Sequence, residues 1–382
     1  MSQLVKKSKK GFLLPPAVGY SFHIVLGLVW KNKISLRYYF RLLITIFINI
    51  INFPFRTFER LFINPKYKKQ DIKNPPIFIV GHWRSGTTHL HNLLCQDQKM
   101  GYTTTFQSVF PDTIFNNIGN FIFEGFAKLL IPGRRAGDNV VLDTKLPQEE
   151  EFALGDKTPI SFYYFWMFPQ KIKEYYKHFI QFKDLDSNQL ESWKSDYKLL
   201  IKKSLKNTNK NMYLSKNPPN TGRVEMLLEM FPNAKFIHIH RNPVEVFLST
   251  HNFFSKMMPH LQLQTIPRES LDVMVFELYE NLMSDYLKQR ELIPKGNLVE
   301  VSFDCLQESP MDVLNNIYKK LNLSGFERAE INFKTYIESK KSYKKNTHKI
   351  SKNHLETLKT TCKFVFEEYN YNIPENIEII ND

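Results

Sequence analysis

The chain has 382 residues, of which 42% are hydrophobic and 14% aromatic, and it carries a formal net charge of +14 at pH 7. This length and apolar content suffice for a sizeable core and exclude a disordered or collagen-like chain, while the charge favours anionic partners such as nucleic acid, acidic membrane surfaces or phosphorylated small molecules. Cys95, Cys305 and Cys362 lie far apart without metal-ligand spacing, so we expect no disulfide framework, no structural zinc site and a reducing, cytoplasmic location.

Residues 1–68 are predicted to form a helical N-terminal extension. They begin with a lysine-rich stretch and contain an apolar run, Leu42 to Phe53, that Asn49 and Asn52 interrupt. This run is too short for a transmembrane helix, and the prolines and histidine that follow the lysines argue against a signal peptide. We favour an arm that packs on the main domain. The alternative is peripheral contact with a membrane, because aromatic residues and arginines lie close together near Arg56.

Residues 69–382 are predicted to form one α/β domain. Four short apolar runs predict strands, each followed by a turn and a helical pattern. These runs are residues 75–80, 212–216, 234–240 and 298–303. Strands that alternate with helices indicate a P-loop-type parallel sheet flanked by helices, with ligands at the carboxyl ends of the strands. Two basic polar stretches, 202–211 and 340–353, are expected to be surface loops.

The first strand runs into the turn "GHWRSGTT", in which Gly81 and Gly86 have the GxxxxG spacing of a P-loop. Backbone N–H groups of such a turn bind phosphate at a helix N-terminus, where the helix dipole also favours negative charge. The lysine position of a nucleotide-hydrolysing P-loop is Thr87, and the cation of this turn is Arg84. The strand "FIHIH" ends in Arg241 instead of a magnesium-binding aspartate, so a P-loop kinase is the disfavoured alternative.

A second anion site is predicted in "HRNPVEVFLST". Arg241 stands at the end of an apolar strand, and Ser249 follows eight residues later in a predicted helix. A guanidinium and a hydroxyl beside the P-loop strand can hold a second phosphate. The alternative is that Arg241 pairs with Glu245. With a P-loop in the same sheet, a ligand with two separated phosphates is the better explanation.

Together these motifs resemble a known family. "GHWRSGTTHLHNLL" resembles the 5′-phosphosulfate loop of PAPS-dependent sulfotransferases, in the form with arginine that is found in bacterial and tyrosylprotein sulfotransferases. "KFIHIHRNPVEVFLST" resembles their 3′-phosphate motif, and the resemblance extends over roughly residues 70–370. It implies transfer of a sulfuryl group from 3′-phosphoadenosine 5′-phosphosulfate (PAPS) to a hydroxyl group, without a metal.

The resemblance also implies roles for individual residues. The 5′-phosphate side would be held by Arg84, Ser85, Gly86, Thr87 and Thr88, with Arg84 stabilising charge on the leaving group. The 3′-phosphate would be held by Arg241 and Ser249. Lys344 or Lys345 in the tail could add to that site, although the GxxG pattern of the family is missing there.

Transfer to a hydroxyl requires a general base. In "LPQEEEFALG", Pro147 suits the first turn of a helix, on which three successive glutamates would point about 100° apart. By resemblance, Glu149 or Glu151 is the candidate base, and a solvated acidic helix turn is the alternative. His82, inside the P-loop, is the next candidate for the base.

Lys216 closes the second predicted strand, so it points toward the same edge of the sheet. By resemblance it contacts the sulfuryl group or the acceptor; the alternative is a surface lysine. His238 and His240 alternate along the next predicted strand and are expected to be packed residues.

The sequence says least about the acceptor. The aromatic run at residues 159–170 is expected to be core, with the wall of an apolar acceptor pocket as the alternative. A hydroxyl-bearing lipid, carbohydrate or other small molecule would suit such a wall. A basic protein that binds nucleic acid or a membrane surface is the non-enzymatic alternative. No nucleic acid partner is expected, because the lysines are spread along the chain and no nucleic-acid-binding motif is present.

Overall fold

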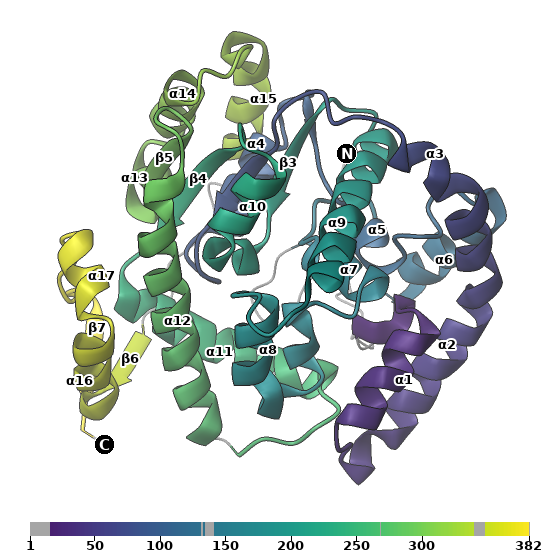
Figure 1. Cartoon of the computed structure of the whole chain (residues 1–382). Helices are drawn as coiled ribbons and strands as arrows, with labels where there is room; N and C mark the ends of the chain where they lie inside the picture. Colours follow the sequence, from purple (N-terminus) through teal and green to yellow (C-terminus); the bar gives the residue numbers. More distant parts are fainter. Residues whose placement is uncertain (1–15, 131–132, 134–140, 268, 340–347, 382) are drawn as a thin grey trace, which may run out of the picture.

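The computed structural model describes residues 16–130, 133, 141–267, 269–339 and 348–381 (Figure 1). At its centre is a five-stranded, all-parallel sheet in the order β2-β3-β1-β4-β5. The four predicted strands are confirmed, and the short edge strand β2 is additional. The strands are β1 (Ile77–Val80), β2 (Met100–Gly101), β3 (Met212–Lys216), β4 (Lys235–His240) and β5 (Leu298–Ser302).

Strand β1 lies in the middle of this sheet because its four apolar residues are buried on both faces. It pairs with β3, where Ile79 is opposite Lys216, and with β4, where Val80 is opposite His238. The strands that follow β1 in the chain thus lie on both sides of it. In such sheets ligands bind beyond the carboxyl end of the strand where the order reverses.

Helices cover both faces of the sheet (Figure 1). Side chains alternate along β1, so that Ile77 and Ile79 belong to one apolar cluster and Phe78 and Val80 to another. The first face is covered by α4 (Thr87–Leu94), α13 (Phe303–Glu308), α14 (Pro310–Lys320) and α15 (Phe326–Glu338). The second is covered by α8 (Ile172–Phe179), α9 (Ser187–Thr208), α10 (Val224–Met230), α11 (Pro243–Leu261) and α12 (Glu269–Gln289).

Both predicted surface loops are partly wrong. Helix α9 continues to Thr208, through most of the stretch 202–211, because Lys203 is fully buried between Glu59 and Asp112. In the second stretch, β6 (His348–Ser351) pairs in parallel with β7 (Ile377–Ile380). Helix α16 (Lys352–Thr361) follows β6, and α17 (Lys363–Glu368) lies before β7.

The N-terminal helical extension is present and packs on the rest of the molecule. Tyr20 belongs to the same apolar cluster as Phe78 of the sheet, and the Ser21 hydroxyl donates to the Asp156 carbonyl at 2.7 Å. Figure 1 shows α1 and α2 at the opposite side of the molecule from α16 and α17. The elements are η1 (Pro16–Gly19), α1 (Phe22–Lys31), η2 (Leu36–Tyr38), α2 (Tyr39–Phe58), η3 (Glu59–Ile63) and α3 (Asn64–Lys68).

The helical segment Leu36–Lys68 has 33 residues and, by length and composition, could cross a membrane. The sequence prediction considered only the apolar run Leu42 to Phe53, and the helix extends beyond it at both ends. A third of its most apolar window is buried inside the protein. The remaining helical elements are α5 (Thr105–Val109), α6 (Asn117–Leu130), α7 (Glu151–Lys157), η4 (Phe162–Trp166), η5 (Pro169–Lys171), η6 (Pro218–Gly222) and η7 (Arg290–Leu292).

Candidate active site

The GxxxxG turn joins β1 to α4, which is the predicted strand–turn–helix arrangement. Gly81 and Gly86 have φ angles of +146° and +102°, in the region that favours glycine. A Cβ atom on Gly81 would lie 2.4 Å from the Ile239 carbonyl oxygen, and one on Gly86 would lie 2.3 Å from the Phe303 ring. Both positions therefore require glycine, and the turn brings its backbone N–H groups to the N-terminus of α4.

Hydrogen bonds fix the shape of this turn. The Gly81 amide donates to the Thr221 hydroxyl at 2.7 Å, and the Ser85 hydroxyl donates to the His82 carbonyl at 2.8 Å. Arg84 has a φ angle of +69°, which costs energy for a residue with a side chain. Such strain persists only where the surroundings enforce it, so the backbone of the loop is held in one conformation at Arg84.

The two predicted anion sites lie next to each other. The Arg84 Nε donates to the Ser249 hydroxyl at 3.0 Å, and an Arg241 Nη lies 3.4 Å from the Arg84 carbonyl oxygen. Arg241 also pairs with Glu245 at 3.1 Å, which is the alternative considered for this arginine. Two guanidinium groups thus follow the carboxyl ends of β1 and β4, and helix α11 brings the Ser249 hydroxyl against one of them.

The acidic segment differs from the prediction in its local structure. Helix α7 begins at Glu151, and Pro147 is not in a helical turn but bridges to Thr104 in extended conformation. Glu149 and Glu150 therefore precede the helix. A solvated acidic turn is also wrong, because all three glutamates are buried and each contacts different partners.

Glu149 is connected to the P-loop. It is the most exposed of the three glutamates, at 7%, and its carboxylate accepts from Lys216 Nζ at 2.5 Å and from the Tyr163 hydroxyl. Trp83 of the P-loop donates its indole N–H to the same tyrosine oxygen at 3.2 Å. Burial and the Glu149 charge raise the pKa of Tyr163, which keeps its hydroxyl a proton donor.

The other two glutamates have structural partners. Glu151 is held by both terminal nitrogens of Arg223, at 2.6 and 3.0 Å, and by the Phe162 amide at 2.8 Å. Burial alone would raise the pKa of Glu151, but Arg223 outweighs it and lowers that pKa. Glu150 accepts from the Tyr197 hydroxyl at 2.8 Å, and burial raises its pKa.

The segment that contains the turn and both anion motifs matches a known family. The model of the sulfotransferase family covers residues 75–328, more than half of the chain. The chain belongs to the sulfotransferase family. This assignment sets aside the kinase and the non-enzymatic alternatives.

Relatives and solved structures agree with this assignment. Omega-hydroxy-beta-dihydromenaquinone-9 sulfotransferase Stf3 from Mycobacterium bovis is 29% identical over 340 residues, covering 88% of this sulfotransferase and 86% of the relative. The protein of the same name from Mycobacterium tuberculosis matches equally. Sulfotransferase STF9 from Mycobacterium avium superimposes with a TM-score of 0.66 at 15% identity, covering 97% of this chain and 99% of that one. Sulfotransferase STF1 from Mycobacterium tuberculosis does so with 0.61 at 14% identity, covering 82% and 85%. The predicted fold is confirmed.

His82, His238 and His240 of the sulfotransferase pack against aromatic rings. His82 is buried, its Nδ1 lies 2.8 Å from the Trp83 carbonyl oxygen, and burial lowers its pKa to about 4. His238 stacks on Tyr286 with ring centroids 3.9 Å apart, and His240 stacks on Tyr369 at 4.0 Å. The expectation that these two strand histidines are packed is confirmed.

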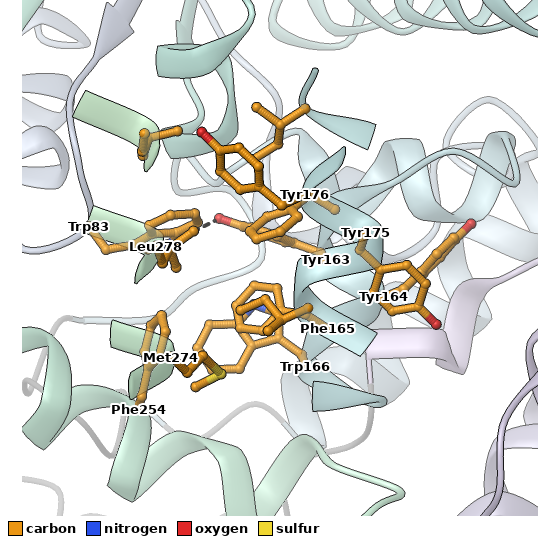
Figure 2. Close-up of a cluster of buried hydrophobic side chains, with 14 of the residues drawn as sticks. Trp83, Tyr163, Tyr164, Phe165, Trp166, Tyr175, Tyr176, Phe254, Met274 and Leu278 are labelled. Carbon is orange, nitrogen blue, oxygen red and sulfur yellow. Dashed lines mark hydrogen bonds between the residues drawn. The ribbon is translucent and has the colours of Figure 1, made fainter. Parts of the chain in front are cut away.

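The aromatic run is core, as favoured from the sequence. All five residues of η4 are buried, and Figure 2 shows Tyr163, Phe165 and Trp166 packed beside Trp83 and Phe254. This aromatic cluster adjoins the Glu149 carboxylate through Tyr163. A tightly packed aromatic cluster therefore lies directly beside the candidate base.

Several residues of the site were missed by sequence reasoning. Tyr163 lies in the aromatic run without any period that singles it out, and Thr221 and Arg223 follow "NPPN" as ordinary polar residues. Lys344 and Lys345 lie outside the described residues. Within the ranges that the structure describes, no group of three or more His, Cys, Asp or Glu side chains could hold a metal ion.

Proposed function

We propose that this sulfotransferase transfers the sulfuryl group of PAPS to the hydroxyl of a lipid alcohol, with Glu149 as the general base. The observation that carries the proposal is that Arg84 and Arg241 follow the neighbouring strands β1 and β4, with Ser249 against Arg84. Lys216, which pairs with Glu149, ends the strand on the other side of β1. Phosphate groups and a transferred group at one edge of a parallel sheet fit this arrangement.

The residues around the turn fit a donor with two phosphate positions. The turn leads into the N-terminus of α4, where its backbone N–H groups would meet a 5′-phosphate. Arg84, Ser85, Gly86, Thr87 and Thr88 would bind it there. Arg241 and Ser249 would bind the 3′-phosphate, for which Arg241 must exchange Glu245 for the ligand. When bound, PAPS supplies an activated sulfuryl group.

Three features favour Glu149 over Glu151 as the base. Glu151 is fully buried, and Arg223 and a backbone amide occupy its oxygens, so removing its charge would disturb the core first. Glu149 is buried but is the most exposed of the three glutamates, and it contacts Lys216 at the end of β3. Lys216 would contact the sulfuryl oxygens and release Glu149 to accept the proton of the acceptor hydroxyl.

The lipid alcohol is proposed from the surroundings of Glu149 and from the relatives. The buried aromatic residues next to Tyr163 make the surroundings of Glu149 apolar, which would suit a hydrocarbon substrate better than a highly hydrated one. The two relatives are named for an omega-hydroxylated menaquinone derivative, a lipid-like alcohol. Carbohydrate acceptors are the weaker candidates.

Calorimetry with 3′-phosphoadenosine 5′-phosphate tests the donor site. We expect it to bind more tightly than ADP, which lacks the 3′-phosphate. Arg241→Ala should weaken its binding about 10- to 100-fold, the loss expected for a charge-assisted hydrogen bond, and leave ADP affinity nearly unchanged. Arg84→Ala should weaken both ligands.

Arg328→Ala is the matched control, because Arg328 is an exposed arginine of α15 outside this site. It should bind both nucleotides like the unmodified protein. Equal affinity of the unmodified protein for 3′-phosphoadenosine 5′-phosphate and ADP would refute the second phosphate position.

A further inference from the structure

The N-terminal helices expose an unusual amount of apolar surface. Of the 25 large apolar side chains that are exposed among the described residues, fourteen come from Phe22 to Phe62 and four from α6. Helix α6 packs on α2 through Phe55 and Phe123, with ring centroids 5.9 Å apart. We call the exposed apolar residues of α1, η2, α2, η3 and α6 the apolar face. Soluble monomers rarely expose so much contiguous apolar surface without a partner.

Helix α2 is inverted relative to a normal surface helix. Four of its six buried residues are polar, while its outer side carries mostly Phe, Leu and Ile. The six are Leu42, Thr45, Ile48, Asn49, Asn52 and Arg56. The Asn49 amide donates to the Ala17 carbonyl at 2.9 Å, and Arg56 donates to the Gly19 carbonyl at 2.8 Å. A surface helix in water usually has the opposite distribution. The outer side of α2 is therefore suited to an apolar environment.

The exposed Lys, Arg, Asp and Glu side chains of residues 22–70 are all positive, whereas Asp71 follows this segment and Glu124 of α6 pairs with Lys128. Exposed lysines and arginines flank it at both ends, namely Lys31, Lys33, Arg37, Lys66, Lys68 and Lys69. Glu59 is the sole acidic residue between Phe22 and Gln70 in the sequence, and it is fully buried against Lys203. An anionic surface would meet cations and no repelling carboxylate from this segment.

We propose that the apolar face docks the protein on an anionic lipid bilayer, with α2 lying in the plane of the interface. A transmembrane orientation of Leu36–Lys68 is disfavoured, because it would remove Asn49 and Arg56 from their buried partners. A second copy of the chain is disfavoured as the occupant, because pairing two such faces along α2, in either direction, brings the cations at the helix ends together. A helix with an apolar face and flanking cations is typical of interfacial binding.

Co-sedimentation of the purified full chain with phosphatidylcholine vesicles, with and without phosphatidylglycerol, tests the proposal. We expect binding that increases with phosphatidylglycerol and falls with added salt. Phe40→Ser/Phe47→Ser removes two outer side chains that are 71% and 63% exposed. It should lower the partition coefficient by about tenfold or more.

Ile331→Ser is the matched control, because Ile331 is 67% exposed on α15. It should bind vesicles like the unmodified protein, and both variants should keep the same unfolding temperature. Absence of vesicle binding by the unmodified protein would overturn the proposal. So would a dimer in vesicle-free buffer that Phe40→Ser/Phe47→Ser dissociates while vesicle binding stays unchanged. The assay contains neither donor nor acceptor, so its result is independent of the proposed sulfuryl transfer.

Discussion

Replacing Glu149 by glutamine is expected to lower kcat by about 10²–10⁴-fold, the range that a positioned general base contributes. The amide keeps the shape of the side chain and can still accept from the Tyr163 hydroxyl, but it cannot take the proton of the acceptor. Binding of 3′-phosphoadenosine 5′-phosphate should stay unchanged, because the carboxylate does not contact the phosphates in the proposed arrangement. Turnover at saturating donor and acceptor measures the effect.

Glu150→Gln is the control for this experiment. Glu150 is a buried neighbour whose partners, Tyr197 and Ser215, donate to the same carboxylate oxygen, and a glutamine oxygen can accept both. Its kcat should equal that of the unmodified enzyme. In Glu149→Gln, Lys216 loses its counter-charge. Thermal unfolding of both variants therefore checks that the substitution has not unfolded the site. Normal turnover by Glu149→Gln would mean that another group is the base, and His82 would be the next candidate.

Local patterns in the sequence were enough to predict the parallel sheet and the P-loop turn. The apolar run before Gly81 gives a strand, and the glycine spacing gives the turn, because both depend on neighbouring residues alone. Arg241 and Ser249 were placed at the next strand for the same reason. The parallel direction of the strands follows from the alternation of strands and helices along the chain.

Features that depend on distant partners could not be predicted in this way. Lys203 lies in a basic polar stretch and was predicted in a surface loop, yet it is buried against Asp112, 91 residues away. The same holds for the acidic segment, where three adjacent glutamates differ only through the partners that face them. Glu149 contacts Lys216, Glu150 contacts Ser215 and Glu151 contacts Arg223. All three partners lie outside the acidic segment, so its sequence alone does not show which glutamate has which partner.

Asp112 provides the second large expected effect. Its carboxylate is completely buried and contacts Arg60 at 2.6 Å, Lys203 at 2.7 Å and Lys157 at 3.0 Å. Asp112→Asn should lower the free energy of unfolding by about 3–5 kcal/mol, because it leaves buried cations without their common counter-ion. Chemical denaturation at pH 7 measures the change. Asp184→Asn, at an exposed ion pair with Lys177, is the control and should leave unfolding unchanged.

The pH dependence gives a further check on Asp112. Burial alone would raise its pKa, but Lys157, Lys203 and Arg60 outweigh burial and hold that pKa well below the ordinary value. A depressed pKa in the folded state means that the stabilisation is complete above the unfolded-state pKa, about 4, and is lost as the pH falls toward the folded-state pKa. The difference between the unmodified protein and Asp112→Asn should therefore shrink only below about pH 4.

A compensating substitution distinguishes charge burial from a simple loss of packing. Lys157→Met in the Asp112→Asn protein removes one of the stranded cations and should recover part of the lost stability, whereas Lys157→Met alone should destabilise. Strictly additive effects of the two substitutions would contradict the charge-burial account. Arg60 is in η3, Lys157 in α7 and Lys203 in α9, so Asp112 joins the N-terminal helices to the helix that follows Glu149. Loss of this carboxylate should thus loosen the support of the candidate base as well as the attachment of the apolar face.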